Sequence, residues 1–175
     1  MTIATPPIVD AIASIRQQFI DTYTREIATT LKVIRAFPPD QIGLTPHPRA
    51  KTAGNLAWMF TLEQGVTLAA LTDKLELPGP PFPPAPGTWE EIVSAFEGGT
   101  TQLLGVLDGM SDAQLMENTQ FFTGPGQIGS MPKINLAWFL LMDQIHHRGQ
   151  LSVYLRICGA KVPSIYGPSA DEPWF

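Results

Sequence analysis

Cysteine, charge and long apolar runs are all scarce in this chain of 175 residues. The single cysteine, Cys158, excludes an internal disulfide framework and fits a reducing compartment, so we expect a cytoplasmic protein. No uninterrupted apolar run approaches the roughly 18 to 20 residues that a membrane span requires. The opening residues, MTIATPPIVD, do not have the pattern of a signal peptide. These features predict a protein that neither spans nor enters a membrane.

Basic residues are also few, with 11 Lys and Arg against 16 Asp and Glu and a net charge of −5. They are scattered without a basic stripe, which argues against binding to nucleic acid or to anionic membranes. Charged residues make up 15% and hydrophobic residues 44% of the chain, a composition typical of a globular protein. We therefore expect one domain over residues 1–175, with more of its surface covered than usual.

Four stretches carry apolar residues at helical spacing. We expect helices over about 8–37, 53–75, 88–107 and 134–158, the third of them opened by a capping box at Thr88-Trp89-Glu90-Glu91. Few strand signals accompany them. The predicted fold is all-α, an antiparallel four-helix bundle with long loops and an extended C-terminal tail.

Proline and glycine are concentrated between these helices. The segment 77–87, LPGPPFPPAPG, holds six prolines, so we expect a stiff loop across one end of the bundle with Phe82 buried beneath it. Ser111 to Gln114 predicts a short helical turn, and the Gly-rich segment 118–131 is a candidate hairpin. The last sixteen residues are too apolar for a free tail and should pack on the bundle, through Val162, Ile165, Tyr166, Trp174 and Phe175.

The last helix carries the strongest chemical signal in the chain. At about 100° per residue, one narrow face collects Leu136, Asp143, His147, Gln150 and Tyr154. Asp143 and His147 are spaced i, i+4, so their side chains converge one turn apart, as two ligands of one metal ion do. Buried ionisable groups are costly unless they are paired, hydrogen-bonded or bound to a cation.

Other polar residues are placed by the same helical geometry. Glu63 lies in an otherwise apolar row of the second helix with Met59, and either an interior role or a solvated glutamate fits it. His146 points about 100° away from the Asp143 face, and Arg148 should serve the helix surface or a dimer contact. His47, between two prolines, should be an exposed loop residue.

The opposite side of the last helix is apolar as well, through Ile134, Trp138, Leu141, Met142 and Ile145. A helix that is apolar nearly all round is normally buried on two sides. A symmetric partner subunit is the commonest second cover, which predicts a homodimer through this helix.

The last helix also carries a recognisable run of residues. HHRGQL at 146–151, followed by Tyr154-Leu155-Arg156, Gly159, Val162-Pro163 and YGPSADE at 166–172, resembles the DinB-like family, which includes the YfiT-type metal-dependent hydrolases. The resemblance covers most of the chain. It implies a four-helix bundle, usually a homodimer, with a divalent metal held by one histidine of the second helix and two of the last. In the related mycothiol-dependent maleylpyruvate isomerase a carboxylate replaces the first histidine of that pair, and Asp143 with His147 looks like this variant.

This sequence departs from the family pattern on the second helix. Met59 stands where the family has histidine, and a thioether is a poor ligand for divalent metals other than soft ones. Glu63, one turn along, is the candidate substitute, giving a set of Glu63, Asp143 and His147. For that set we expect zinc or nickel ahead of manganese or iron.

Three functions follow from this reading. The first is a metal-dependent transferase or hydrolase acting on a small molecule or a low-molecular-weight thiol, with Gln150 or Tyr154 orienting the substrate. The second is a metal-free, non-catalytic dimer in which Asp143 and His147 form a buried pair. The third is a small-molecule-binding protein whose pocket, left by a degenerate metal site, is lined by Met59, Phe60 and Trp58.

Overall fold

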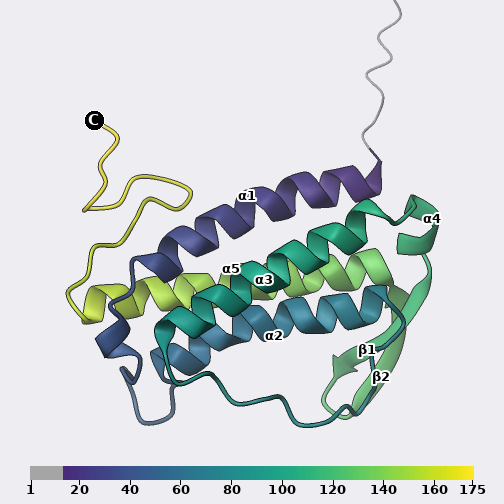
Figure 1. Ribbon diagram of the computed structural model, residues 1–175, viewed down its shortest axis with the longest axis horizontal. Coiled ribbons are helices and arrows are strands. Elements are labelled where there is room, and N and C mark those ends of the chain that lie inside the picture. Colours follow the sequence, from purple (N-terminus) through teal and green to yellow (C-terminus); the bar gives the residue numbers. More distant parts are fainter. Residues whose placement is uncertain (1–13) are drawn as a thin grey trace, which may run out of the picture.

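Four long helices lie side by side in the computed structural model, which describes residues 14–175 (Figure 1). They are α1 (Ile15–Arg35), α2 (Ala53–Leu71), α3 (Trp89–Asp108) and α5 (Lys133–Ile157). The predicted four-helix bundle is thereby confirmed. The proposed start of the first helix, with Ile8 and Ile12, lies outside the described residues.

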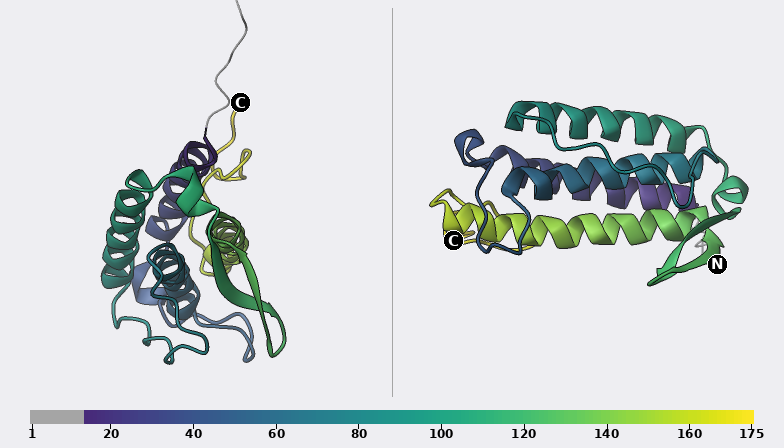
Figure 2. Two further views of the ribbon diagram at one scale, coloured as in Figure 1. Left: turned by 90° about the vertical axis from the view of Figure 1, so that its right-hand side faces the viewer. Right: turned by 90° about the horizontal axis from the view of Figure 1, so that it is seen from below.

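The direction of the helices explains the long proline segment. In both figures α1 and α5 run one way and α2 and α3 the other, so the connection from α2 to α3 must return along the whole bundle (Figure 1 and Figure 2). The indole nitrogen of Trp58 donates a hydrogen bond to the carbonyl of Pro83 at 2.9 Å, which holds this return against α2. The expectations of a loop across one end and of a buried Phe82 are both wrong, because the segment runs lengthwise and Phe82 is 63% exposed.

Side chains just before the helices stabilise their first turns. Thr88 and Glu91 form the predicted capping box of α3, and Ser111 with Gln114 forms another at the short helix α4 (Asp112–Leu115). The Thr52 hydroxyl accepts a hydrogen bond from the backbone N–H of Asn55 at the start of α2. Each such cap satisfies backbone donors that a helix start leaves without partners.

A two-stranded hairpin leads into α5, as the Gly-rich segment suggested. Its strands β1 (Asn118–Gly124) and β2 (Gln127–Pro132) are antiparallel. At its foot the buried Lys133 amine forms ion pairs with Asp73 and Glu117 at 2.8 and 3.0 Å. These contacts join the end of α2 to the start of α5. A short 3-10 helix, η1 (Pro39–Gln41), follows α1.

Helix α5 is buried on two sides by its own chain. It packs against α2 on one side and against α1 on the other, where the ring of Trp138 meets Phe19 edge to face with centroids 5.0 Å apart. The second cover expected from a partner is therefore α1, which buries Ile134 and Leu141. A third side remains exposed, and we call its apolar residues the outer stripe: Phe139, Met142, Val153 and Ile157.

The C-terminal segment packs on the bundle only in part. Pro163 is buried, and Val162 and Ile165 lie against the main core. Trp174 and Phe175 are exposed, so the expected packing of these last two residues is wrong. Across residues 14–175, none of the helices combines the length and the apolar character needed to cross a bilayer.

Candidate metal centre

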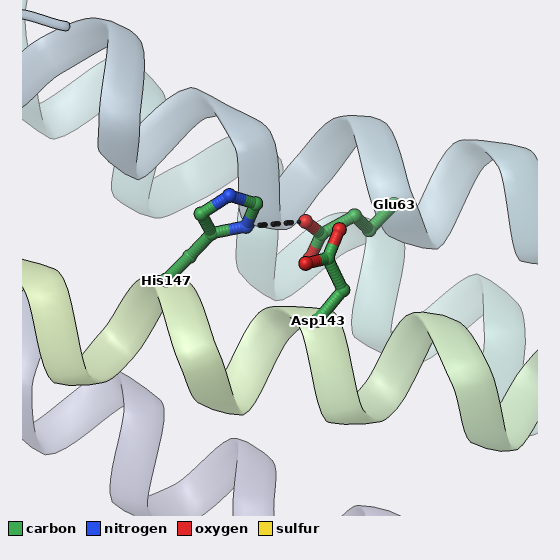
Figure 3. A group of neighbouring side chains, drawn as sticks. All are labelled: Glu63, Asp143 and His147. Carbon is green, nitrogen blue, oxygen red and sulfur yellow. Dashed lines mark hydrogen bonds and ion pairs between the residues drawn. The ribbon is translucent and has the colours of Figure 1, made fainter. Parts of the chain in front are cut away.

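Two helices far apart in the sequence bring three potential ligands together inside the bundle (Figure 3). Glu63 comes from α2, while Asp143 and His147 lie one turn apart on α5 and point toward it. The Nδ1 atom of His147 lies 2.7 Å from Oε1 of Glu63. One ligand atom from each of the three residues lies within 4.8 Å of the other two, so a single cation can contact all three.

Burial gives this cluster an unusual affinity for protons. The Glu63 side chain is 5% exposed, and this burial raises the pKa of Glu63 to about 7, with the neighbouring Asp143 raising it further and the His147 hydrogen bond opposing the rise. The hydrogen bond to Glu63 raises the pKa of His147. A proton is therefore retained between the Glu63 carboxyl and the His147 imidazole near neutral pH.

The cluster also has the composition that a divalent cation requires. Oε2 of Glu63 is buried and has no hydrogen-bond partner in the part of the chain that the structure describes, and Asp143 lies beside the same carboxyl group. Within residues 14–175, no lysine or arginine forms an ion pair with Glu63 or Asp143. Two adjacent carboxylates and one imidazole are oxygen and nitrogen donors of the kind that zinc accepts, and a cation offsets the repulsion between the carboxylates. The residues fit a divalent metal ion.

The other predicted site residues divide into two groups. Met59 is half-buried one turn before Glu63, and Tyr154 is 7% exposed with its hydroxyl donating to the carbonyl of Lys51 at 2.9 Å. Gln150, by contrast, is exposed and pairs with His146 at 3.0 Å, so its placement on the site face is wrong. The buried side of α5 beyond His147 is formed by Leu151 and Tyr154, and Gln150 lies at its exposed edge.

Arg148 lies in the interior, against the expectation of a surface or dimer position. Its side chain is 1% exposed and forms an ion pair with Glu26 of α1 at 2.7 Å. It also donates to the Thr30 hydroxyl and to the Tyr166 hydroxyl of the C-terminal segment. The helical repeat placed Arg148 away from the metal-ligand face, but it could not show that α1 and the C-terminal segment cover this side of α5.

Sequence reasoning did not single out the two glutamines that follow the carboxylate ligands. Gln64 and Gln144 come directly after Glu63 and Asp143, and both are 2% exposed in the core. The available signal was an acidic residue followed by glutamine within an apolar stretch of helix, present once in α2 and once in α5. This pattern alone does not show that Gln64 and Gln144 are buried, because their burial depends on the packing of α1 and α3 around them.

Comparison with known proteins agrees with this architecture. The family model described as the DinB family matches residues 13–174. The chain belongs to the DinB family. A solved DinB-like protein from Bacillus cereus ATCC 10987 is 26% identical, with a TM-score of 0.72 over 86% of this chain and 97% of that chain. The DinB-like protein YjoA from Bacillus subtilis, at 14% identity, has the same fold with a TM-score of 0.67, over 85% of this chain and 96% of that chain.

A curated relative is similarly close in sequence. The uncharacterized protein YrdA from Bacillus subtilis strain 168 is 26% identical over 155 residues, which cover 88% of this chain and 89% of that protein. The comparisons thus establish the DinB family and its fold, and the specific activity has to be argued from the site.

Proposed function

We propose that Glu63, Asp143 and His147 hold one divalent metal ion, zinc or nickel ahead of manganese or iron. The observation that supports this most directly is the convergence of two carboxylates and an imidazole within 4.8 Å, together with a buried Glu63 oxygen that has no partner within residues 14–175. A divalent ion with three protein ligands supplies Lewis acidity, which lowers the pKa of water or of a thiol toward neutrality.

The protein's own groups suit a hydrolase or a transferase acting on a small molecule or a low-molecular-weight thiol. Glu63 Oε1 and His147 Nδ1 lie 2.7 Å apart and share a proton before the ion binds. Binding of the ion would release this proton, and the ion would then supply the activated water or thiol. Tyr154 lies about two turns beyond His147 on α5, and its hydroxyl donates to the carbonyl of Lys51, so its part is to hold the loop before α2 in place.

Titration with Zn²⁺, followed by calorimetry and elemental analysis of untagged protein, tests the proposal. We expect one equivalent to bind. Binding should weaken by more than about 100-fold in His147→Ala and Glu63→Gln, because loss of a ligand costs more than loss of an outer partner. His146→Ala is the matched control, since His146 is the exposed neighbour on the same helix. Zinc binding that survives in His147→Ala would contradict the proposal.

One observation favours a second candidate, the metal-free bundle. The pair expected for that bundle was Asp143 with His147, but His147 instead pairs with Glu63, at 2.7 Å and without any cation. In that case neither zinc nor nickel should raise the melting temperature, while Glu63→Gln and His147→Ala should still destabilise the fold. The predicted small-molecule pocket has less support, because Phe60 is fully buried in the core.

We also propose that the protein is a homodimer joined through the outer stripe of α5. Phe139 and Met142 lie near the start of α5 and Val153 and Ile157 near its end, each at least half exposed, and the helical repeat puts all four on one side. We expect a second copy of this chain to pack against the outer stripe, because a two-fold axis brings the same apolar helix face of both copies together.

A further inference from the structure

A small cavity lies in the centre of the bundle, directly behind the metal ligands. All four long helices line it, including Tyr23 of α1, Gln64 of α2, Leu103 of α3 and Gln144 of α5. Its volume is about 10 Å³, which is close to the minimum for one buried water molecule.

The hydrogen bonds around the cavity fix the orientation of both glutamine amides. The Thr100 hydroxyl donates to the carbonyl of Phe96, so its oxygen can only accept from Gln64, whose Nε2 lies 2.8 Å away. On α5, Nε2 of Gln144 donates to the carbonyl of Phe60 at 3.2 Å. The atoms left over are therefore the two amide oxygens, which are buried without a hydrogen-bond partner among the described residues.

Tyr23 completes the set with a donor. Its hydroxyl oxygen accepts from Nε2 of Gln64 at 3.0 Å and has the Thr100 hydroxyl as a second neighbour, and within residues 14–175 its own proton is donated to no acceptor. Burial raises the pKa of Tyr23 to about 12, so the hydroxyl keeps this proton at neutral pH. Two acceptors and one donor around one small cavity match a water molecule, which donates twice and accepts. A bare cation would satisfy the two oxygens but would face the hydroxyl proton.

We propose that this cavity holds one ordered water molecule, which donates to Gln64 Oε1 and Gln144 Oε1 and accepts from the Tyr23 hydroxyl. Two buried amide oxygens without partners would lower the stability of the fold, because each has lost its hydrogen bonds to water without replacement. The water removes this cost and connects α1, α2 and α5 at one point.

The position of this water gives it a second consequence, which rests on the proposed function. Gln64 and Gln144 directly follow Glu63 and Asp143, so a bridge between the two glutamines sets the separation of α2 and α5 where the carboxylates converge. Gln64 and Gln144 are thus positioning residues that hold the two carboxylates at the spacing a cation needs. Partners behind the ligands commonly set metal affinity in this way.

A high-resolution crystal structure of the metal-free protein tests the water directly. We expect one density peak within about 3.2 Å of all three atoms, and its loss in Tyr23→Phe, a variant that keeps the ring in the core. If crystals of the unchanged protein show no density in the cavity, the proposal is wrong. So would a peak that scatters anomalously after a rubidium soak, because that result would identify a cation site.

Zinc calorimetry tests the positioning role. Gln144→Leu should weaken zinc binding by about tenfold, whereas Gln150→Leu, an exposed glutamine on the same helix, should leave it unchanged. If Gln144→Leu does not fold, Tyr23→Phe gives the same comparison with a milder change. Equal zinc affinity in a folded variant would refute the positioning role. If the unchanged protein binds no zinc, the proposed function and the positioning role both fail, and the density still decides on the water.

Discussion

Glu63 couples the stability of the protein to pH through its burial. Burial raises the pKa of its carboxyl group from the ordinary value of 4.5 to about 7, and the hydrogen bond to Glu63 raises the pKa of His147. Both groups bind protons more tightly in the folded chain, so protonation stabilises the fold. This contribution is full at low pH and is lost as pH rises through about 7 for Glu63.

We therefore expect the metal-free protein to lose stability between about pH 5.5 and pH 8 because of this pair. Urea unfolding of EDTA-treated protein at the two pH values measures the effect. Glu63→Gln should flatten the dependence, because its amide does not titrate. A divalent metal ion should reverse the trend, since binding displaces the shared proton and grows stronger as pH rises. A stability that rises with pH in the metal-free protein would contradict the assignment.

Residues differ in how far the sequence alone could place them. The spacing of Asp143 and His147 is a property of one helix, so their convergence was predictable. Glu63 forms a hydrogen bond with His147, which lies 84 positions away in the sequence. From the apolar row of α2 in which Glu63 lies, an interior position and a solvated position were equally possible. Arg148 and Gln150 were placed wrongly because which residues of α5 are buried depends on the packing of α1 and the C-terminal segment against the helix.

At the scale of elements, neighbouring glycines of α3 have opposite environments. A Cβ atom on Gly99 would lie 2.3 Å from Oε1 of Gln64, whereas a Cβ atom on Gly98 would meet nothing within 4 Å. Glycine inside a helix usually lowers its stability. The structure instead gives Gly99 a packing role, because only a residue without a side chain lets Gln64 lie against α3.

Gly98→Ala and Gly99→Ala should consequently shift stability in opposite directions. Alanine at position 98 should stabilise by up to about 1 kcal/mol, which is the helix propensity difference. At position 99 the methyl group displaces the Gln64 amide from its two hydrogen bonds, so we expect a net loss of about 1 to 3 kcal/mol. Urea denaturation of both variants provides the measurement, and equal stabilisation by the two would show that Gln64 moves aside freely.

Helix positions were predicted well because apolar period and capping residues act locally. The capping box at Thr88 and Glu91 and the hairpin before α5 are local features of this kind. The direction of α3 was not predictable in the same way. It depends on whether the segment after α2 crosses the end of the bundle or returns along its length, and the prolines are compatible with both.

For the whole molecule, the outer stripe predicts how the protein assembles. Light scattering should give twice the 19.1 kDa of one chain. Met142→Glu combined with Val153→Glu should yield monomers, because two carboxylates would be buried against a second copy of the same surface. Gln102→Glu, on the exposed side of α3, is the control and should remain dimeric. A monomeric unchanged protein would exclude this assembly.

The lengthwise return between α2 and α3 restricts how this chain can be shortened. The 19 residues of α2 extend about 28 Å at about 1.5 Å per residue, and a proline-rich strand advances about 3.1 Å per residue. Roughly ten residues are thus needed to bring the chain back to the end where α3 begins. Seventeen residues separate Leu71 from Trp89, so insertions are easily accommodated here. A deletion of more than about seven residues would leave this connection too short. Helix α3 would then have to run in the opposite direction, and its backbone at Gly99 would no longer face Gln64.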